Sequence, residues 1–363
     1  MQIKLFFSFI ACIIECCFSI ISNVYILKEI NGTWLDIFLL DLQMFTAQNF
    51  TVLFDFCDGS DLSLISSRAN TSSVDRKLPK KSLFDSSRSA TFLPSTRNFS
   101  TLLGNGIEAK DFANILGVST YFTFGIIKEI GWTAEHFAVD GVLGLSLQPT
   151  NNNVSTSWEQ LSGHMDKLII SIFNNRTKQG NGSAIVTMQD FDSVNCQSDW
   201  VKVSLVGGKQ QFFLHSLQAD LNNEEQKLIV NRNVSILPFF GRIYAPNAVK
   251  FLITNASGAV YNETVDMYII DCDMQKAGNV TLNVRSGAQT QQLVLTGRDY
   301  IKHCPIYDVC YVAIIGYEDE GTHYTTVSLP QQFLNNRCMA FDISRREIAF
   351  ANVRYPNNEP KRN

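Results

Sequence analysis

The sequence predicts an all-β fold arranged in about two lobes. Apolar, β-branched and aromatic runs of roughly four to eight residues recur along the chain, separated by clusters of Gly, Asn, Asp and Ser, which is the pattern of short strands and turns. Helical periodicity is scarce, and no heptad, low-complexity tract or short-period repeat occurs. The chain has 363 residues, which is enough for two domains with well-formed cores.

The individual elements follow from these runs. The clearest strands are expected over residues 50–54, 138–145, 167–173, 184–188, 200–205, 267–271, 280–284 and 347–353. Short helices are expected over residues 157–165, directly after Pro246, and over residues 329–334. A polar stretch between residues 188 and 196 is the expected join between the lobes. The predicted division is a signal peptide over 1–22, an N-terminal lobe over 23–190, a C-terminal lobe over 191–355 and a disordered tail over 356–363.

The first residues are typical of an export signal. Lys4 precedes an apolar run over residues 5–14, and the small residues Ser19 and Ser22 offer cleavage sites. The run is short for a membrane span, and the alternative is an N-terminal anchor. No other segment approaches membrane-spanning length, so the mature chain is expected to be soluble, either secreted or in the endo-lysosomal lumen.

Sequons and cysteines favour the same compartment. Eleven Asn-x-Ser/Thr sequons occur, at Asn31, Asn49, Asn70, Asn98, Asn153, Asn175, Asn181, Asn233, Asn255, Asn262 and Asn279. Six cysteines lie beyond the signal, at Cys57, Cys196, Cys272, Cys304, Cys310 and Cys338. An even number predicts disulfides in an oxidising compartment, but six cysteines allow about fifteen connectivities.

Several classes of function receive no support from the sequence. The net charge is −4 and there is no basic stripe, so a nucleic-acid partner is not expected. There is no CxxC or HExxH pattern, so no metal site is expected. G-x-S-x-G, P-loop and dinucleotide-binding motifs are also absent, and no cofactor is expected.

Segments along nearly all of the mature chain resemble, in the right order, those of pepsin-like aspartic peptidases. Residues 48–55 resemble the strand that delivers the first catalytic Asp, and residues 99–107 resemble the flap. The other matching segments are residues 84–92, 139–145, 191–196, 268–273, 310–315 and 333–351. The 191–196 turn is similar to one in nematode members of the family.

This resemblance implies a bilobal pepsin-like acid protease fold, with two β-barrel-like lobes around a central cleft. It implies that the flap residues Leu103, Gly104, Asn105 and Gly106 lie over bound peptide, and Leu103 stands where the family has Tyr. It also implies a disulfide between Cys272 and Cys310, and it leaves the pairing of the other cysteines open.

The first catalytic position is degenerate. Family members use two Asp residues that share a proton, because like charges a few ångströms apart cannot both ionise. Each Asp is followed by Thr and Gly, but here Asp55 is followed by Phe56 and Cys57. Asp55 is therefore interpreted as the remnant of the first acid. The alternative is a polar residue that caps a strand or faces solvent.

The second position is interpreted as lacking its acid. Residues 228–237 align without a gap to A-I-V-D-T-G-T-S-L-L, which puts Asn231 at the Asp position, with Arg232 and Asn233 in place of Thr and Gly. An amide does not share the proton. In this alignment the Asn233 sequon falls on the cleft floor, where it is expected to be buried and unused. The family's I-L-G-D aligns with residues 328–331, which places Pro330 at the Gly.

The sequence therefore predicts a secreted, glycosylated homologue of aspartic peptidases that is catalytically inactive, is monomeric and binds an extended peptide or protein in the cleft. One alternative is an active aspartic endopeptidase with a rearranged site, in which Asp58 or Asp61 approaches Asp55. A third interpretation is a structural or decoy secreted glycoprotein whose cleft has collapsed.

Overall fold

The computed structural model describes most of the chain between residues 24 and 354. The described residues are 24–31, 36–44, 48–55, 61–70, 81–101, 103–131, 134, 139–148, 155–175, 183–207, 209–221, 224–237, 241–304, 306–318, 326–335 and 337–354. The expected signal peptide and C-terminal tail lie outside them. Strands dominate this part of the chain, which confirms the all-β prediction. Within it, no helix is both long and apolar enough to cross a membrane.

A large sheet carries all of the strands described before residue 190. These are β1 (Val24–Asn31), β2 (Asp36–Met44), β3 (Gln48–Asp55), β4 (Ser63–Asn70), β5 (Leu93–Thr101), β6 (Gly104–Ile115), β7 (Val118–Ile130), β8 (Gly141–Gly144), β9 (Ile169–Asn175) and β10 (Ser183–Met188). Three strands from later in the chain join them, namely β11 (Val201–Ser204), β23 (Arg337–Asp342) and β24 (Glu347–Asn352). The strand order is β11-β24-β23-β9-β10-β1-β2-β3-β8-β4-β7-β6-β5.

Two smaller sheets are built from the C-terminal part of the chain. The seven-stranded sheet has the order β18-β17-β12-β13-β22-β14-β21, and the four-stranded sheet has the order β15-β16-β20-β19. Their strands are β12 (Gln211–Leu221), β13 (Glu224–Leu237), β14 (Ile243–Pro246), β15 (Val260–Asn262), β16 (Met267–Ile270), β17 (Val280–Ser286), β18 (Gln289–Leu295), β19 (Ile301–Cys304), β20 (Val309–Val312), β21 (Ile314–Tyr317) and β22 (Thr326–Pro330).

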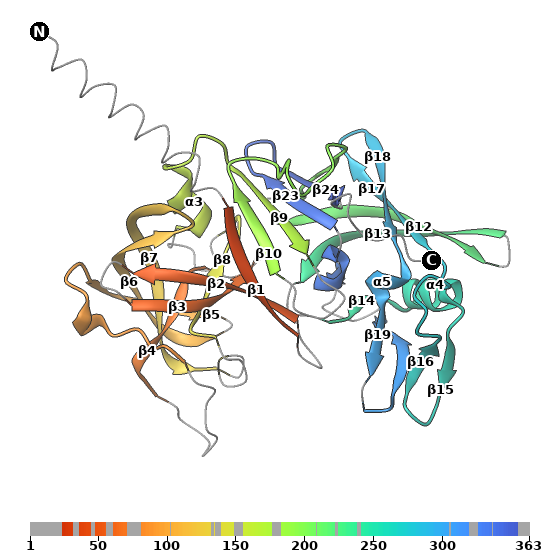
Figure 1. Cartoon of the computed structure of the whole chain (residues 1–363), viewed down its shortest axis with the longest axis horizontal. Coiled ribbons are helices and arrows are strands. Elements are labelled where there is room, and N and C mark those ends of the chain that lie inside the picture. The colour runs from red at the N-terminus through yellow and green to blue at the C-terminus, as the bar shows by residue number, and fades with distance from the viewer. Residues whose placement is uncertain are drawn as a thin grey trace, which may run out of the picture.

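The strands of the two halves gather on opposite sides of the molecule. Figure 1 shows β2 to β8 on one side and the two smaller sheets on the other, with β9, β10, β23 and β24 between them. The halves share one sheet, because β23 pairs antiparallel with β9, with Cys338 beside Phe173. The expected boundary at residue 190 remains a prediction, since three later strands complete the sheet of the first half.

Short helices occur where the sequence predicts them. The α3 helix (Ser157–Ser162) begins with a capping box, in which Thr156 Oγ1 accepts from the Glu159 amide and Glu159 accepts from the Thr156 amide. The α4 helix (Asn247–Ser257) starts after Pro246 and ends at Gly258, whose φ of 76° suits glycine. The remaining helices are α5 (Gly297–Tyr300) and the 3₁₀ turns η1 (Ser86–Arg88) and η2 (Gln331–Leu334).

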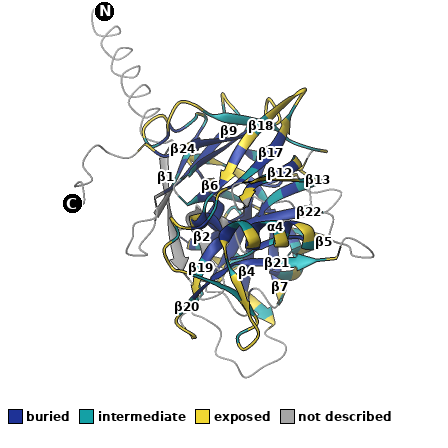
Figure 2. Cartoon of the chain, turned by 90° about the vertical axis from the view of Figure 1, so that its right-hand side faces the viewer, coloured by how far each residue is buried: buried dark blue, intermediate teal, exposed yellow. Residues whose placement is uncertain are grey.

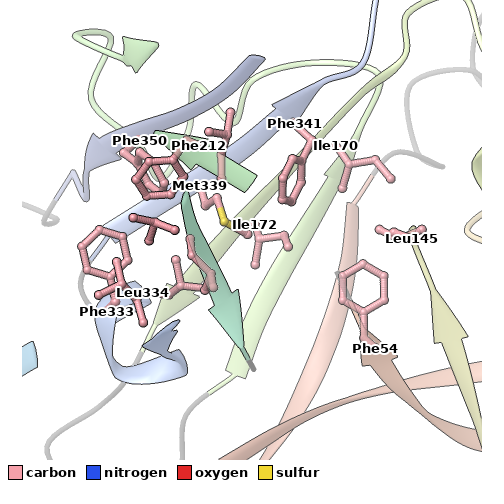
Figure 3. Packing of buried hydrophobic residues seen from close by; sticks show 14 of the residues in the cluster. Phe54, Leu145, Ile170, Ile172, Phe212, Phe333, Leu334, Met339, Phe341 and Phe350 are labelled. Carbon is pink, nitrogen blue, oxygen red and sulfur yellow. The ribbon is translucent and has the colours of Figure 1, made fainter. Parts of the chain in front are cut away.

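One hydrophobic cluster runs through both halves. It includes Phe54 and Leu145 from the first half, and Phe212 and Phe350 from the second. The rings of Phe212 and Phe350 meet edge to face at a centroid distance of 5.8 Å, and Figure 3 shows these side chains around the shared sheet. Dark blue buried residues accordingly run through the centre of the molecule in Figure 2, with exposed residues toward its edges. This continuous core holds the ends of β3 and β13 on one rigid framework.

Two disulfides tie loops to the sheets. Cys196 is bonded to Cys338 in β23, and Cys272 is bonded to Cys310 in β20, which is the pair implied by the family resemblance. Cys304 is a free thiol. Cys57 lies outside the described residues. The Cys196–Cys338 bond links residues 142 positions apart and closes the polar turn after β10 onto the shared sheet.

Replacing both cysteines of this long-range bond, in the double variant Cys196→Ala with Cys338→Ala, is expected to lower the free energy of unfolding by about 2–5 kcal/mol, because the unfolded chain gains conformational freedom. Urea denaturation followed by circular dichroism measures the change. The single variant Cys304→Ala is the control and should lie within about 1 kcal/mol of the parent. Equal midpoints for the double variant and the parent would contradict the assignment.

Candidate functional site

Asp55 ends a buried strand. It is the last residue of β3, its side chain is 1% exposed, and the preceding Phe54 is fully buried. The β3 strand runs parallel to β8, with Asp55 beside Gly144, and the Leu145 amide donates to the Asp55 carbonyl at 2.7 Å. Asp55 therefore does not face solvent. It is a buried carboxyl group at the point where two parallel strands end.

The Asp140 carboxylate fixes this parallel pair. Its Oδ2 accepts from the Thr51 amide at 2.7 Å, and its Oδ1 accepts from the Ser82 amide at 2.6 Å. Lys81 donates to the Val139 carbonyl at 3.1 Å. Burial lowers the pKa of the Lys81 ammonium, and the negative charge of Asp140 opposes part of this shift. Asp140 is thus a structural residue that holds the start of β8 beside β3.

Gly141 is required by a close approach in the same turn. A Cβ atom at this position would lie 2.2 Å from the Ser63 carbonyl oxygen, so only glycine lets β8 pass between β3 and β4. The crossing strand β8 is parallel to β3 and antiparallel to β4, and it pairs Val142 with both Leu53 and Ser63. The β4 strand in turn runs parallel to β7.

The C-terminal half repeats this arrangement. The β22 strand is parallel to β13 and antiparallel to β14, and β14 runs parallel to β21. Ser328 in β22 pairs with both Ser235 and Tyr244, as Val142 in β8 pairs with Leu53 and Ser63. The four strands β13, β22, β14 and β21 therefore correspond to β3, β8, β4 and β7.

The strand register identifies the counterpart of Asp55. In the first half, the parallel pairing of β3 with β8 ends two residues after Val142, with Asp55 beside Gly144. In the second half, the parallel pairing of β13 with β22 ends two residues after Ser328, with Leu237 beside Pro330. By this register Leu237 takes the place of the second acid, and Pro330 takes the place of Gly144.

The assignment of Asn231 to that place is corrected by the same register. Asn231 lies six residues before Leu237, inside the long strand β13, and its side chain is exposed. It sits at a bulge where two residues of β13 oppose His215 of β12, with a φ of 48°, and its Oδ1 lies 3.0 Å from His215 Nδ1. The sequence of residues 228–235 resembles the family motif at the end of a strand, but in the structure β13 continues through these residues.

A second carboxyl group is absent from this segment in either alignment. No Asp or Glu occurs between residues 228 and 250 of the sequence. On the N-terminal side, Asp61 is 2% exposed and follows Asp55 by six residues, and Asp58 lies outside the described residues. Among the described residues, no group of three His, Cys, Asp or Glu side chains forms a candidate metal site.

The predicted flap is a hairpin of β5 and β6. Its turn places Leu103 in the core rather than over a groove, because Leu103 is fully buried and packs in a cluster that includes Leu53 and Val142. The Leu103 carbonyl accepts from the Gly131 amide at 2.8 Å. Gly104 has a φ of 137°, which an L side chain rarely adopts. Of the four expected flap residues, Asn105 and Gly106 line a pocket.

Comparison with known proteins agrees with this geometry. A family model described as "Eukaryotic aspartyl protease" matches residues 44–353. The chain belongs to the eukaryotic aspartyl protease family. The match covers both parallel ladders, from β3 to β24.

Individual relatives are distant. The chain is 24% identical over 292 residues to "Aspartic protease 1" of Caenorhabditis elegans, covering 75% of this chain and 70% of that protein. It is 24% identical over 299 residues to "Aspartic protease 6" of the same nematode, covering 75% and 71%. It is also 24% identical over 269 residues to "Aspartic-type endopeptidase ctsD" of Aspergillus fumigatus, covering 72% of this chain and 54% of that protein.

The bulge at Asn231 gives a direct test of its structural role. Asn231→Val should lower the free energy of unfolding by about 1–2 kcal/mol, because a β-branched residue is strained at positive φ. Asn231→Gly tolerates this φ and should stay within about 1 kcal/mol of the parent. Urea denaturation of the two variants measures the difference, and equal stability of the Val and Gly variants would exclude the left-handed backbone at this position.

Proposed function

We propose that this protein is a catalytically inactive aspartic peptidase homologue of the secretory pathway, which binds an extended peptide or protein segment between its two halves. The observation that carries the proposal is Leu237, an apolar residue at the position that corresponds to Asp55. The chain keeps the framework of a peptidase and one of its two acids.

The chemistry of the family requires both acids. One carboxylate acts as general base on a water molecule while the other, protonated, polarises the scissile carbonyl. A leucine neither shares a proton nor donates one, so a water molecule beside Asp55 lacks the second group. Residues that act as a catalytic unit fail together rather than in part, and the loss of one is expected to abolish turnover.

Binding is supported by what remains of the framework. Both parallel ladders, the shared core and the β5–β6 hairpin are intact. Pepsin-like enzymes handle peptides in extended form, and an extended segment gains affinity by pairing its backbone with a strand edge. A floor with Leu237 in place of an acid offers this segment an apolar contact and carries less charge to desolvate.

Passage through the secretory pathway is supported by the cysteines and the sequons. Two disulfides are formed, and such bonds persist in oxidising compartments and are rare in the cytosol. The sequence also carries eleven sequons. Together with the apolar start of the chain, these features point to a lumenal or extracellular location.

The absence of catalysis is tested directly with the purified wild-type protein. Incubation with a denatured protein substrate between about pH 3 and pH 6, the range in which carboxyl dyads operate, is expected to give no fragments above those of a buffer control. Electrophoresis and mass spectrometry detect cleavage, and an active pepsin is the positive control. Cleavage that is blocked by pepstatin would reject the proposal and favour the rearranged active site.

The binding role is tested by filling the floor at residue 237. A fluorescently labelled pool of extended decapeptides should bind the wild-type protein, and Leu237→Trp should weaken this binding at least about tenfold, or about 1.4 kcal/mol, by occupying the space of the peptide. Fluorescence polarisation measures the affinity. Ile229→Trp is the matched control, because Ile229 is an exposed residue of the same strand, and it should leave the affinity unchanged. Equal affinities for both variants would contradict the proposed groove, provided that circular dichroism confirms their folding.

A further inference from the structure

A pocket with both polar and apolar lining lies over β5, β6 and β7. It has a volume of about 390 Å³ and is lined by residues 98–100 of β5, residues 105–107 of β6, and Lys128 and Glu129 of β7. Asn98, Ser100, Lys128 and Glu129 are exposed. Pockets for small ligands span roughly 300–1,000 Å³, so this one has room for one or two sugar residues.

Two residues at the pocket, Asn98 and Ser100, lie on the face of β5 opposite to a buried cluster. Phe99 pairs with Gly106, which pairs with Ile127, and the side chains of Phe99 and Ile127 are buried in the cluster that holds Leu103. Side chains alternate between the two faces of a strand, so Asn98 and Ser100 share the opposite face.

Asn98 is also the acceptor residue of a sequon, Asn98-Phe99-Ser100. Its side chain is exposed and opens onto the pocket, so a glycan on it meets no steric obstacle. The sequon at Asn233 differs. Asn233 lies on a central strand, paired with Phe213 on one side and Thr326 on the other, and its amide is 3.4 Å from Gln211 Oε1.

We propose that Asn98 carries an N-linked glycan whose first sugar residues rest in this pocket. The amide of Asn105, the ammonium of Lys128 and the carboxylate of Glu129 are donors and acceptors for the sugar hydroxyl and acetamido groups. Half-buried Ile107 offers an apolar surface for a sugar ring. This inference rests on the proposed passage through the secretory pathway.

The position of the glycan suits the exposed edge of the sheet. The β5 strand is the last in the order of the large sheet, and most of its residues are exposed. An exposed strand edge is a template for pairing with another chain, and natural proteins protect such edges. A glycan at Asn98, in the middle of the nine residues of β5, covers this edge and keeps molecules apart.

Site occupancy is the first test. The full chain is secreted from insect cells and treated with peptide N-glycosidase in ¹⁸O water, which converts each glycosylated Asn to labelled Asp. Mass spectrometry should find the label at Asn98 in most molecules and no label at Asn233. A secreted chain with an unmodified Asn98 would overturn this inference alone. A chain that is retained in the cytosol without any glycan would overturn the proposed location and this inference together.

The contact between glycan and pocket is the second test. On the native protein, the glycosidase should release the Asn98 glycan at least about tenfold more slowly than the glycan at exposed Asn255 of α4, and Asn105→Ala with Lys128→Ala should remove this difference while keeping the sequon. Equal release rates for the two sites in the unmutated protein would refute the pocket. Light scattering should show concentration-dependent association for Asn98→Gln and none for the control Asn255→Gln, and a monodisperse Asn98→Gln would refute the protective role.

Discussion

The parallel pairing of β13 with β22 is the constraint on which the rest of the account depends. A strand that is paired on both sides cannot slip, because a shift of one residue would turn every buried side chain to the opposite face. The pairing of Ser235 and Tyr244 with Ser328 therefore fixes the end of β13 at Leu237. The same pattern in the first half ends at Asp55. The two ladders define equivalent positions, and they hold an acid in one half and a leucine in the other.

This difference changes what the site can do, while the framework stays intact. The buried Asp140 carboxylate accepts two backbone amides, and the continuous core supports both ladders. Such features serve the fold whether or not the protein is an enzyme. The altered positions, Leu237 and Pro330, lie instead where the family places its acid and the glycine beside it. The framework is well packed around these two altered positions, and the proposed binding role rests on this observation.

The fold could be predicted well from the sequence because strands and helix starts depend on local patterns of residues. Runs of apolar residues gave the strands, and Pro246 gave the start of α4. From the sequence, the altered second position was placed at Asn231, whereas the strand register places it six residues later, at Leu237. The sequence around Asn231 resembles the family motif. The long β12–β13 hairpin and its bulge, however, depend on strand pairing that cannot be read from a single sequence. The short distance in sequence from Leu237 to the α4 helix after Pro246 was the signal that could have located the second position. Burial of Leu103 and the pocket at Asn98 also depend on tertiary packing.

The most direct test of the central claim is the acid–base titration of the Asp55 carboxyl group, followed by ¹³C NMR with selectively labelled Asp. A carboxyl group that does not share its proton with a second acid titrates in one step, whereas a proton-sharing pair titrates in two coupled steps. The account predicts that Asp55 titrates in one step in the wild-type protein and also in the Asp61→Asn and Asp58→Asn variants. A two-step curve that becomes a single step in either variant would contradict it, because a second acid would then share the proton of Asp55.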